Sequence, residues 1–379
     1  MTVWDELIGQ GAAVETLRRA VSGDTHAMTH AWLFTGPPGS GRSNVARAFA
    51  AALQCPKGGC GECQACRTVA SGAHPDVSVV RTETLSIGIK VISGIVTKAA
   101  MSPSLGRRQI IIIEDADRVT ERGAPALLKA IEEPSPRTVW LLCAPTLDDV
   151  LVTIRSRCRP VSLVTPTDEA VAQLLIARDK IDPGVAHFAA RIAQGHVGRA
   201  RHLARDEGTR NRRHDLLKIP AQLTKVGACL RAADNLVKGA AEEATTQTSA
   251  LDEKEKAELT AALGFGATGV RPRNTAAALK ELDDQQKLRA KRIQRDALDR
   301  VLTEFTVYYR DVLSVQLKTG VRLINEELAA PIGSFARRTT PEQTIRRIDA
   351  ILDTRTALEG NVAPLLAMEA LMVSLGEEL

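Results

Sequence analysis

A glycine-rich loop at residues 36–43 is the part of this 379-residue sequence best suited to hold an anion. Its order, Gly-Pro-Pro-Gly-Ser-Gly-Arg-Ser, follows the pattern of a phosphate-binding loop, whose backbone N–H groups and following helix start face the phosphates. Arg42 occupies the place of the usual lysine, and a planar guanidinium is a poor substitute for a compact ammonium. We expect weak ATP or ADP binding without hydrolysis. The predicted cradle consists of Gly36, Gly39, Gly41 and Ser43.

Two carboxylates follow the apolar run 110–113, where a buried strand is predicted to end. A carboxylate at this place holds the Mg²⁺ that bridges the outer phosphates, and its neighbour polarises the attacking water. The pair here is Glu114 then Asp115, the reverse of the usual order, so the second side chain is one methylene short. The alternative is a solvated strand end. We expect the placement to be kept and the chemistry weakened, with Mg²⁺ bound only if nucleotide is bound.

Four cysteines lie within residues 55–66, separated by turn-forming glycines. Their spacing is typical of a tetrathiolate zinc knuckle, a closed structural site, and three overlapping spacings fit zinc better than a redox pair. We expect the knuckle to be an excursion from the core. The predicted ligands are Cys55, Cys60, Cys63 and Cys66.

Arg157 lies within the turn Ser156-Arg157-Cys158, between two further arginines. A group of arginines is usually a solvated basic edge. An arginine at a strand edge of this kind of fold can instead point at a neighbouring subunit's nucleotide and stabilise charge on its γ-phosphate.

Composition limits the class of protein. Charged residues make up 25% of the chain, apolar residues 44% and aromatic residues 3%, with a net charge of +5. These values are typical of a globular protein and argue against a surface that grips single strands by base stacking. The absence of a long apolar run predicts no membrane association and a cytoplasmic location.

Strands alternating with helices up to about residue 165 predict a doubly wound, five-stranded parallel sheet. The predicted strands are 31–34, 75–81, 109–113, 138–144 and 159–164, and the intervening helices include 44–53, 87–98 and 125–133. Short helices follow at 168–177, 183–194 and 200–217.

The remaining chain is predicted to be all-helical. A packing stripe runs from Leu298 to Leu313 within a long helix at 275–318, and two further helices cover 341–359 and 361–375. Residues 239–274 read as a mobile insertion of unknown role, with a helix only at 251–263. The expected domains are 1–165, a helical lid at 166–210 and a helical oligomerisation domain at 211–379.

Taken together, these motifs resemble the clamp-loader branch of the AAA+ ATPases and, within it, the delta-prime subunits of the bacterial DNA polymerase III clamp loader. Besides the loop, the cysteines, the acidic pair and the Ser-Arg-Cys turn, the resemblance rests on His74-Pro75-Asp76, Ala126-Leu127-Leu128-Lys129 and Glu132-Glu133-Pro134. The specific motifs cover roughly residues 3–205.

The resemblance implies a stator that helps to load a sliding clamp onto primed DNA during replication. Its implied partners are the tau/gamma and delta subunits, with the clamp and primer-template DNA reached through the complex. Arg157 would act in trans on a neighbouring ATP site, while the chain itself would not hydrolyse ATP. The polar sensor position falls on Ala144 or Pro145 and the lid arginine position on Gly198, which favours the stator.

Two other functions stay open. An ATP-hydrolysing, tau/gamma-like motor is the first alternative, opposed by Arg42, the inverted acidic pair and Gly198. A solitary zinc-bearing DNA-binding module is the weaker one. Its only support is a group of basic residues, which a helix surface explains equally well: Arg199, Arg201, Arg205, Arg210, Arg212 and Arg213.

Overall fold

The computed structural model describes residues 2–23, 26–81, 86–262 and 275–376. The chain divides into two compact units, Met1–Asp206 and Glu207–Leu379. Each unit has its own hydrophobic core. The finer sequence-based division into three domains stays a prediction.

The first unit is built on a parallel sheet with five strands among the described residues. Its strands run in the order β2-β3-β4-β1-β5, so that β1 lies between β4 and β5. Their apolar runs are continuous because both faces are covered. The strands are β1 (Ala31–Thr35), β2 (Val77–Val80), β3 (Gln109–Ile113), β4 (Thr138–Ala144) and β5 (Arg159–Ser162).

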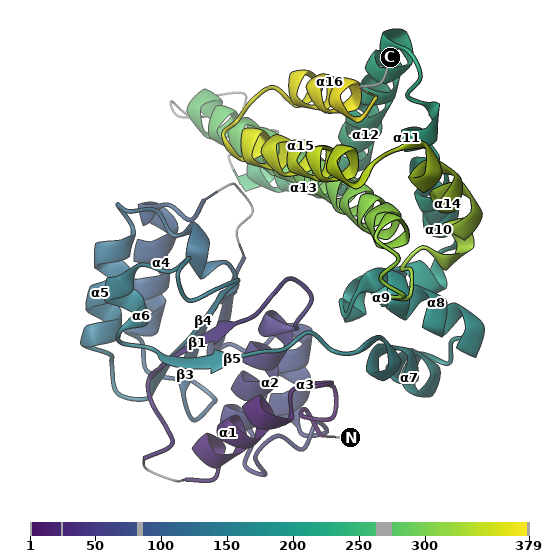
Figure 1. The fold of residues 1–379 in the computed structure, drawn as a ribbon. Helices are drawn as coiled ribbons and strands as arrows, with labels where there is room; N and C mark the ends of the chain where they lie inside the picture. Colours follow the sequence, from purple (N-terminus) through teal and green to yellow (C-terminus); the bar gives the residue numbers. More distant parts are fainter. Residues whose placement is uncertain (1, 24–25, 82–85, 263–274, 377–379) are drawn as a thin grey trace. The chain divides into compact units, whose positions relative to one another are not determined.

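Helices cover both faces of this sheet (Figure 1). Alternation along β3 divides the core, because Ile110 and Ile112 pack on one side while Ile111 and Ile113 pack on the other. The first face carries α1 (Gly11–Val21), α2 (Arg42–Gln54) and α3 (Gln64–Ser71), and the second carries α4 (Ile89–Ala99), α5 (Ala124–Glu132) and the short α6 (Val152–Arg155). A 3-10 turn, η1 (Ala116–Arg118), follows β3. The predicted fold class is confirmed.

A small helical group completes the first unit. Its helices are α7 (Asp168–Asp179), α8 (Pro183–Ala193) and α9 (Val197–Arg205), packed around an alanine-rich cluster. Thr167 and Asp182 cap the first two through side-chain oxygens that accept backbone N–H groups. The single helix predicted at 200–217 is wrong: α9 ends at Arg205 and a new helix begins at Glu207. The backbone of the intervening Asp206 is extended, which interrupts the helical hydrogen bonds.

The second unit is entirely helical in its described part. The predicted stripe is confirmed, since Leu298, Leu302, Phe305, Tyr308 and Val312 are buried in its core. Its elements are α10 (Glu207–Leu216), α11 (Ile219–Gln222), α12 (Val226–Ala262), α13 (Thr275–Gln316), η2 (Glu326–Leu328), α14 (Ala329–Arg338), α15 (Pro341–Glu359) and α16 (Pro364–Leu375).

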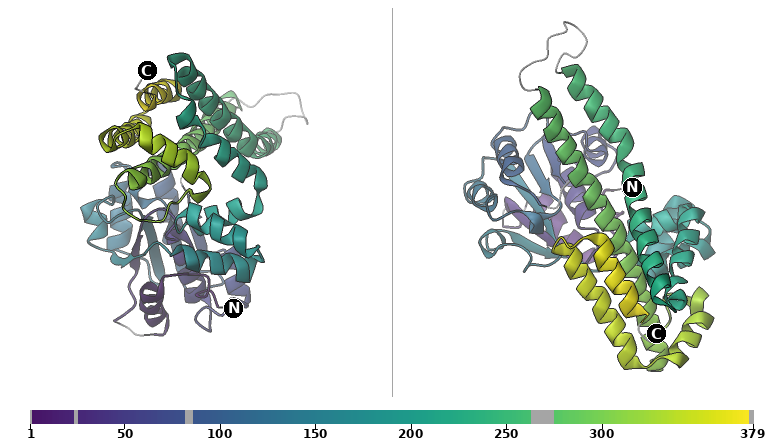
Figure 2. Two further views of the ribbon diagram at one scale, coloured as in Figure 1. Left: turned by 45° about the vertical axis from the view of Figure 1, so that its right-hand side comes forward. Right: turned by 90° about the horizontal axis from the view of Figure 1, so that it is seen from above.

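The structure corrects the irregular stretch that was expected from residue 239 onward. Residues 239–262 continue α12, and α12 and α13 lie side by side (Figure 2). Ala240, Ala244 and Thr248 are buried along α12, so small residues replace the apolar stripe that the sequence lacks. Residues 263–274, which the expected insertion also includes, lie outside the described residues.

Helices long and apolar enough to cross a membrane do not occur among the described residues.

Candidate functional site

The glycine-rich loop connects the carboxyl end of β1 to the amino end of α2. Gly39 and Gly41 have φ angles of +89° and +86°, in the left-handed region that glycine adopts without a steric penalty. Gly36 N–H donates to the carbonyl of Pro145 at 3.0 Å. Part of the loop lines a cavity of about 340 Å³, together with the start of α2. Of the predicted cradle, Gly39, Gly41 and Ser43 line this cavity, whereas Gly36 is not among its lining residues.

His196 forms the opposite wall of this cavity, and the sequence did not single it out. A Cβ atom on Gly39 would lie 2.8 Å from the Cα of His196, so the close approach requires glycine. His196 Nδ1 accepts the backbone N–H of Arg199 at 3.2 Å, which caps α9. Burial, followed by the nearby Arg199 charge, lowers the pKa of His196. The available signal was the pair of glycines close to His196, Gly195 directly before it and Gly198 two positions after it.

A second residue that sequence reasoning missed fastens the loop to the sheet. Gln10 is buried, and its amide nitrogen donates to the carbonyls of Ser40 at 3.1 Å and Val164 at 2.7 Å. Its amide oxygen accepts the N–H of Val164 at 3.2 Å. The Gln10 side chain thereby links the N-terminal segment to the glycine-rich loop and to the segment after β5.

The Arg42 side chain is engaged by the loop itself. Its Nη1 donates to the carbonyl of Gly36 at 3.0 Å. The guanidinium thus binds the backbone of the loop rather than standing free for a phosphate.

Glu114 is held by two arginines at the carboxyl end of β3. Its two carboxylate oxygens lie 2.8 Å from Arg47 and 2.7 Å from Arg81, and its side chain is 11% exposed. The residues that line the phosphate-loop cavity do not include Glu114 or Asp115. A carboxylate satisfied by two cations has little capacity left for Mg²⁺, because the metal would have to displace charge-assisted hydrogen bonds.

The residues of the cavity suit the binding of phosphate groups better than the hydrolysis of a nucleotide. The positive-φ glycines and the α2 start suit phosphate oxygens. Ser40 Oγ is buried without a hydrogen-bond partner among the described residues. The sensor position offers only Ala144, which is buried, or Pro145, whose side chain cannot donate. These residues fit phosphate binding and do not fit metal-assisted hydrolysis.

Arg157 lies at the surface beside α5. Its side chain is 40% exposed, and Nη2 lies 2.5 Å from the carboxylate of Glu132. Nη1 donates to the carbonyl of Thr153 at 2.8 Å and to Ser156 Oγ at 3.2 Å. These contacts orient the guanidinium while it remains accessible from outside the chain.

The four predicted cysteine ligands come together. Their sulfur atoms all lie within 4.8 Å of one another, and Cys55 Sγ is 3.6 Å from Cys60 Sγ and 3.7 Å from Cys63 Sγ. Sulfurs bound tetrahedrally to zinc at about 2.3 Å lie about 3.8 Å apart, so the arrangement fits that ion. None of these cysteines forms a disulfide. The cluster of Cys55, Cys60, Cys63 and Cys66 can hold a metal.

Backbone N–H groups prepare this cluster for metal. Burial alone would raise the pKa of Cys55, but N–H groups of Cys60, Gly59 and Lys57 lower it to about 6. The pKa of Cys60 is also lowered, chiefly by the N–H of Glu62. Burial raises the pKa of Cys66. Thiolates are the form that binds metal, and a bound cation would deprotonate the buried thiol as well.

The expectation that the knuckle stands apart from the core is wrong. Cys55 and Cys66 are 2% and 1% exposed and belong to the core cluster below α2. The N-terminal segment closes over the cysteine loop, because Trp4 Nε1 donates to the carbonyl of Gly58 and Val3 N–H donates to that of Gly59, both at 3.0 Å. The prediction failed because the first ligand, Cys55, directly follows α2 and the last, Cys66, lies within α3, and both helices pack against the sheet.

The basic residues of α9 and α10 are largely engaged within the chain. Arg201 and Arg205 share the carboxylate of Asp179, at 2.6 and 3.0 Å. Arg213 is buried and pairs with Glu304 at 2.9 Å. These contacts weaken the case for a nucleic-acid surface along this stretch.

Comparison with known proteins gives the chain its relatives. Residues 9–167 match the family model described as "DNA polymerase III, delta subunit". DNA polymerase III subunit delta' of Pseudomonas aeruginosa is 38% identical over 151 residues, which is 38% of this chain and 45% of that protein. The Bacillus subtilis subunit delta' is 26% identical over 92% of both chains. The chain thus spans less than half of the first relative and nearly all of the second.

Three other similarities have lower coverage of the matched chains or low TM-scores. The gamma/tau subunit of Mycobacterium bovis is 33% identical over 168 residues, 42% of this chain and 29% of that protein. Among solved structures, a gamma subunit-related protein of Thermotoga maritima has a TM-score of 0.35 at 18% identity, covering 76% of this chain and 99% of its own. The Holliday-junction branch migration motor RuvB of the same organism has a TM-score of 0.39 at 18% identity, over 57% and 65%.

Proposed function

Because this chain is a relative of the DNA polymerase III delta-prime subunits, we propose that it acts as a stator of the clamp loader. In this role it helps to place the sliding clamp on primed DNA and does not hydrolyse ATP. It supplies Arg157 to the ATP site of a neighbouring subunit.

The observation that carries the proposal is the double ion pair of Glu114. Arg47 and Arg81 both bind the carboxylate that a motor would use for Mg²⁺. In a working phosphoryl-transfer site this carboxylate and its metal neutralise the charge that develops on the phosphate. A glutamate neutralised by two arginines leaves the chain without that function.

Two further features support a non-hydrolysing site. Arg42 donates to the loop carbonyl of Gly36. Gly198 stands at the lid position, one residue before Arg199, and lines the cavity without a side chain that could reach a phosphate. Weak ATP or ADP binding through the backbone N–H groups remains part of the proposal.

Arg157 supports the action in trans. Its exposure leaves the guanidinium accessible, and its contacts with Glu132 and Thr153 hold it in place. A fork of N–H donors matches a γ-phosphate in a bidentate manner. The proposed partners are the tau/gamma and delta subunits, with the clamp and DNA reached through the assembled complex.

The proposal includes zinc as a structural ion. When bound, the ion would join the thiolates of the four-cysteine cluster into a closed site with no position for a substrate. The protein side of this arrangement is the pair of buried cysteines, Cys55 and Cys66, which tie the loop to the core.

A second candidate function is favoured by the match to gamma/tau subunits, which extends over 168 residues at 33% identity. Under that alternative the chain would be an ATP-hydrolysing motor. The two candidates differ in whether the isolated chain turns ATP over.

The test measures steady-state ATP hydrolysis by the purified full-length chain, alone and after assembly with tau/gamma and delta subunits, the clamp and primed DNA. We expect no turnover by the isolated chain and turnover by the assembly. Arg42→Lys in the isolated chain should leave the result unchanged, because Glu114 stays paired. Sustained turnover by the wild-type chain alone would reject the stator and favour the motor.

A further inference from the structure

A second cavity lies at the amino ends of the strands, whereas the phosphate loop follows the carboxyl end of β1. Its volume is about 440 Å³, and it is lined by Met28, Arg107, Arg108 and Arg137, among others. Met28 precedes β1, Arg108 immediately precedes β3, and Arg137 immediately precedes β4. All strands are parallel, so these residues mark the amino ends of the strands, whereas the phosphate loop follows a carboxyl end. The cavity is therefore separate from the phosphate loop, although Cys55 of the cysteine cluster lines part of it.

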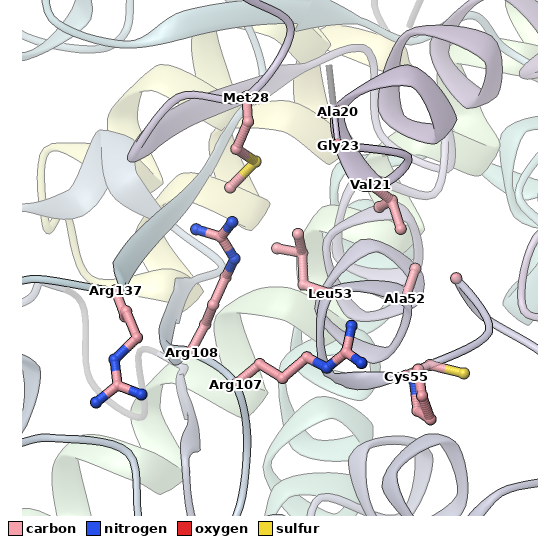
Figure 3. A pocket seen from close by; sticks show the side chains of 12 residues that line it. Ala20, Val21, Gly23, Met28, Ala52, Leu53, Cys55, Arg107, Arg108 and Arg137 are labelled. Carbon is pink, nitrogen blue, oxygen red and sulfur yellow. The ribbon is translucent and has the colours of Figure 1, made fainter. Parts of the chain in front are cut away.

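Three arginines give this pocket a positive charge. Among the described residues, the lining includes no acidic side chain and Arg107, Arg108 and Arg137 form no ion pair. Arg108 directs its guanidinium group toward Met28, and Arg107 directs its own toward Ala52 and Cys55 (Figure 3). Burial lowers the pKa of Arg108, yet an arginine keeps its proton at neutral pH. Arg108 and Arg137 therefore have no carboxylate partner among the described residues, whereas Arg107 points toward the cysteine cluster.

Gln54 fixes the backbone that carries two of the arginines. Its Oε1 accepts the N–H groups of Arg107 at 2.8 Å and Arg108 at 3.3 Å, and its Nε2 donates to the carbonyl of Arg108 at 2.6 Å. Gln54 is 4% exposed and belongs to the last turn of α2. The arginine backbone is therefore held independently of the arginine side chains.

Asp76 fixes the preceding part of the same loop. Its carboxylate accepts the N–H and hydroxyl of Ser104 and the N–H groups of Leu105 and Gly106. Burial opposes ionisation, but the hydrogen bonds from Ser104, Gly106 and Leu105 prevail and lower the pKa of Asp76 to about 2. Two buried polar side chains, Gln54 and Asp76, thus hold the loop in one conformation. A binding site made in this way loses little entropy when a ligand arrives.

Arg137 is held in an uncommon backbone conformation at the rim. Its φ is +69°, in the left-handed region where residues other than glycine are strained, and its carbonyl accepts the N–H of Gln109 at 3.1 Å. Such strained residues concentrate at functional sites. A glycine would relieve the strain here, but it would remove the third cation.

The interior of the pocket is apolar. Ala20, Ala52 and Leu53 are 3%, 1% and 6% exposed, and Val21 and Met28 complete the apolar wall. A bare phosphate would leave this wall without a partner. Aromatic side chains, on which nucleic-acid bases stack, are not among the lining residues. The complementary ligand carries both carboxylates and an aliphatic group.

We propose that this pocket binds an acidic peptide segment of a partner protein, with an aliphatic side chain against Met28 and Leu53 and carboxylates on Arg107, Arg108 and Arg137. Arginine forks bind carboxylates in a bidentate manner, and a wall of small and aliphatic side chains accepts one apolar anchor.

The test uses fluorescence anisotropy with the full-length chain and a labelled peptide of alternating aspartate and leucine. We expect saturable binding that falls about tenfold or more in the double variant Arg107→Ala/Arg108→Ala, because two charge-assisted contacts are lost. Folding should be unaffected, since Gln54 binds only the backbone of these residues. Met28→Glu provides a second variant, which should also weaken binding because it introduces a competing carboxylate beside Arg108.

Matched controls define the outcomes. Arg122→Ala removes an exposed arginine from elsewhere in the unit and should leave binding unchanged. A peptide of aspartate and serine should bind more weakly than the aspartate–leucine peptide, and a single-stranded oligonucleotide should not bind in an Arg108-dependent manner. Equal binding of the aspartate–leucine peptide by wild-type and double-variant protein would overturn the proposal. So would its failure to bind, or an oligonucleotide that binds more tightly with the same arginine dependence.

Discussion

Glu114 and Arg47 form an ion pair of 2.8 Å between the end of β3 and helix α2. Arg81 completes the arrangement at 2.7 Å on the other carboxylate oxygen. We expect Glu114→Gln to lower the free energy of unfolding by about 1–3 kcal/mol, because the largely buried carboxylate loses its pair with Arg47; the more exposed Arg81 adds little. Urea unfolding measures this loss.

The same variant separates the two candidate functions. Under the stator proposal, Glu114→Gln leaves any nucleotide affinity of the isolated chain unchanged in the presence or absence of Mg²⁺. Isothermal titration with ADP checks this. A Mg²⁺-dependent affinity that disappears with Glu114→Gln would show that the carboxylate serves a metal.

Cysteine replacement should affect metal content and stability to different degrees. Cys60→Ser and Cys66→Ser should both abolish binding of about one zinc ion per chain. Cys66→Ser should cost about 1–3 kcal/mol more in unfolding free energy, because its hydroxyl would be buried in the core cluster. Metal analysis and urea unfolding, each with and without chelator, give the two readouts. Wild-type protein with far less zinc would contradict the proposed structural ion.

Asp76 predicts an acid-sensitive contribution to stability. The folded-state pKa of about 2 lies below the ordinary value of 3.8, so the stabilisation is fully present above pH 4 and is lost as pH falls toward 2. The shift corresponds to about 2 kcal/mol. Asp76→Asn should remove this part of the pH dependence, whereas Asp353→Asn, at an exposed position, should not. Unfolding free energies measured between pH 2 and 6 test the difference.

Arg157→Ala should separate assembly from catalysis. The exposed pair with Glu132 contributes less than about 1 kcal/mol, so the chain should fold and assemble normally. Loss of an arginine finger lowers the rate at its own site by roughly a thousandfold or more. Because one of several sites is affected, the ATPase and clamp-loading rates of the whole complex should fall by less.

The controls for this prediction lie nearby. Arg157→Lys should rescue poorly, since an ammonium cannot make the bidentate contact. Arg155→Ala, which removes a neighbouring arginine paired with Asp148, should leave both rates unchanged. If the complex with Arg157→Ala keeps full ATPase and clamp-loading rates, Arg157 does not act on a neighbouring ATP site and is only a charged surface residue.

Continuous apolar runs were the most informative signal in the sequence. Strands β3 and β4 have the predicted bounds, 109–113 and 138–144, because strands covered on both faces need uninterrupted apolar residues. The cysteine cluster was also predictable, since its ligands are close in sequence.

Contacts between distant residues could not be predicted. Glu114 meets Arg47 across 67 positions, and His196 meets Gly39 only after the small helical group has folded. Helix α12 was largely missed because its buried residues, apart from Cys229, are alanine and threonine, which carry little periodic signal. The pocket of arginines was missed because its members come from three separate strand starts.

The packing of α12 against α13 determines how these two helices separate during local unfolding. Small residues such as Ala240 and Ala244 bring the backbones together, and farther along Gln286 and Arg289 bind Asp252 and Glu255. The contacts are spread along the pair, from Gln294 with Val237 to Gln286 with Asp252, so the two helices can separate stepwise along their length. Amide hydrogen exchange should therefore slow gradually from the far end toward Phe305, with no single cooperative step along the two helices.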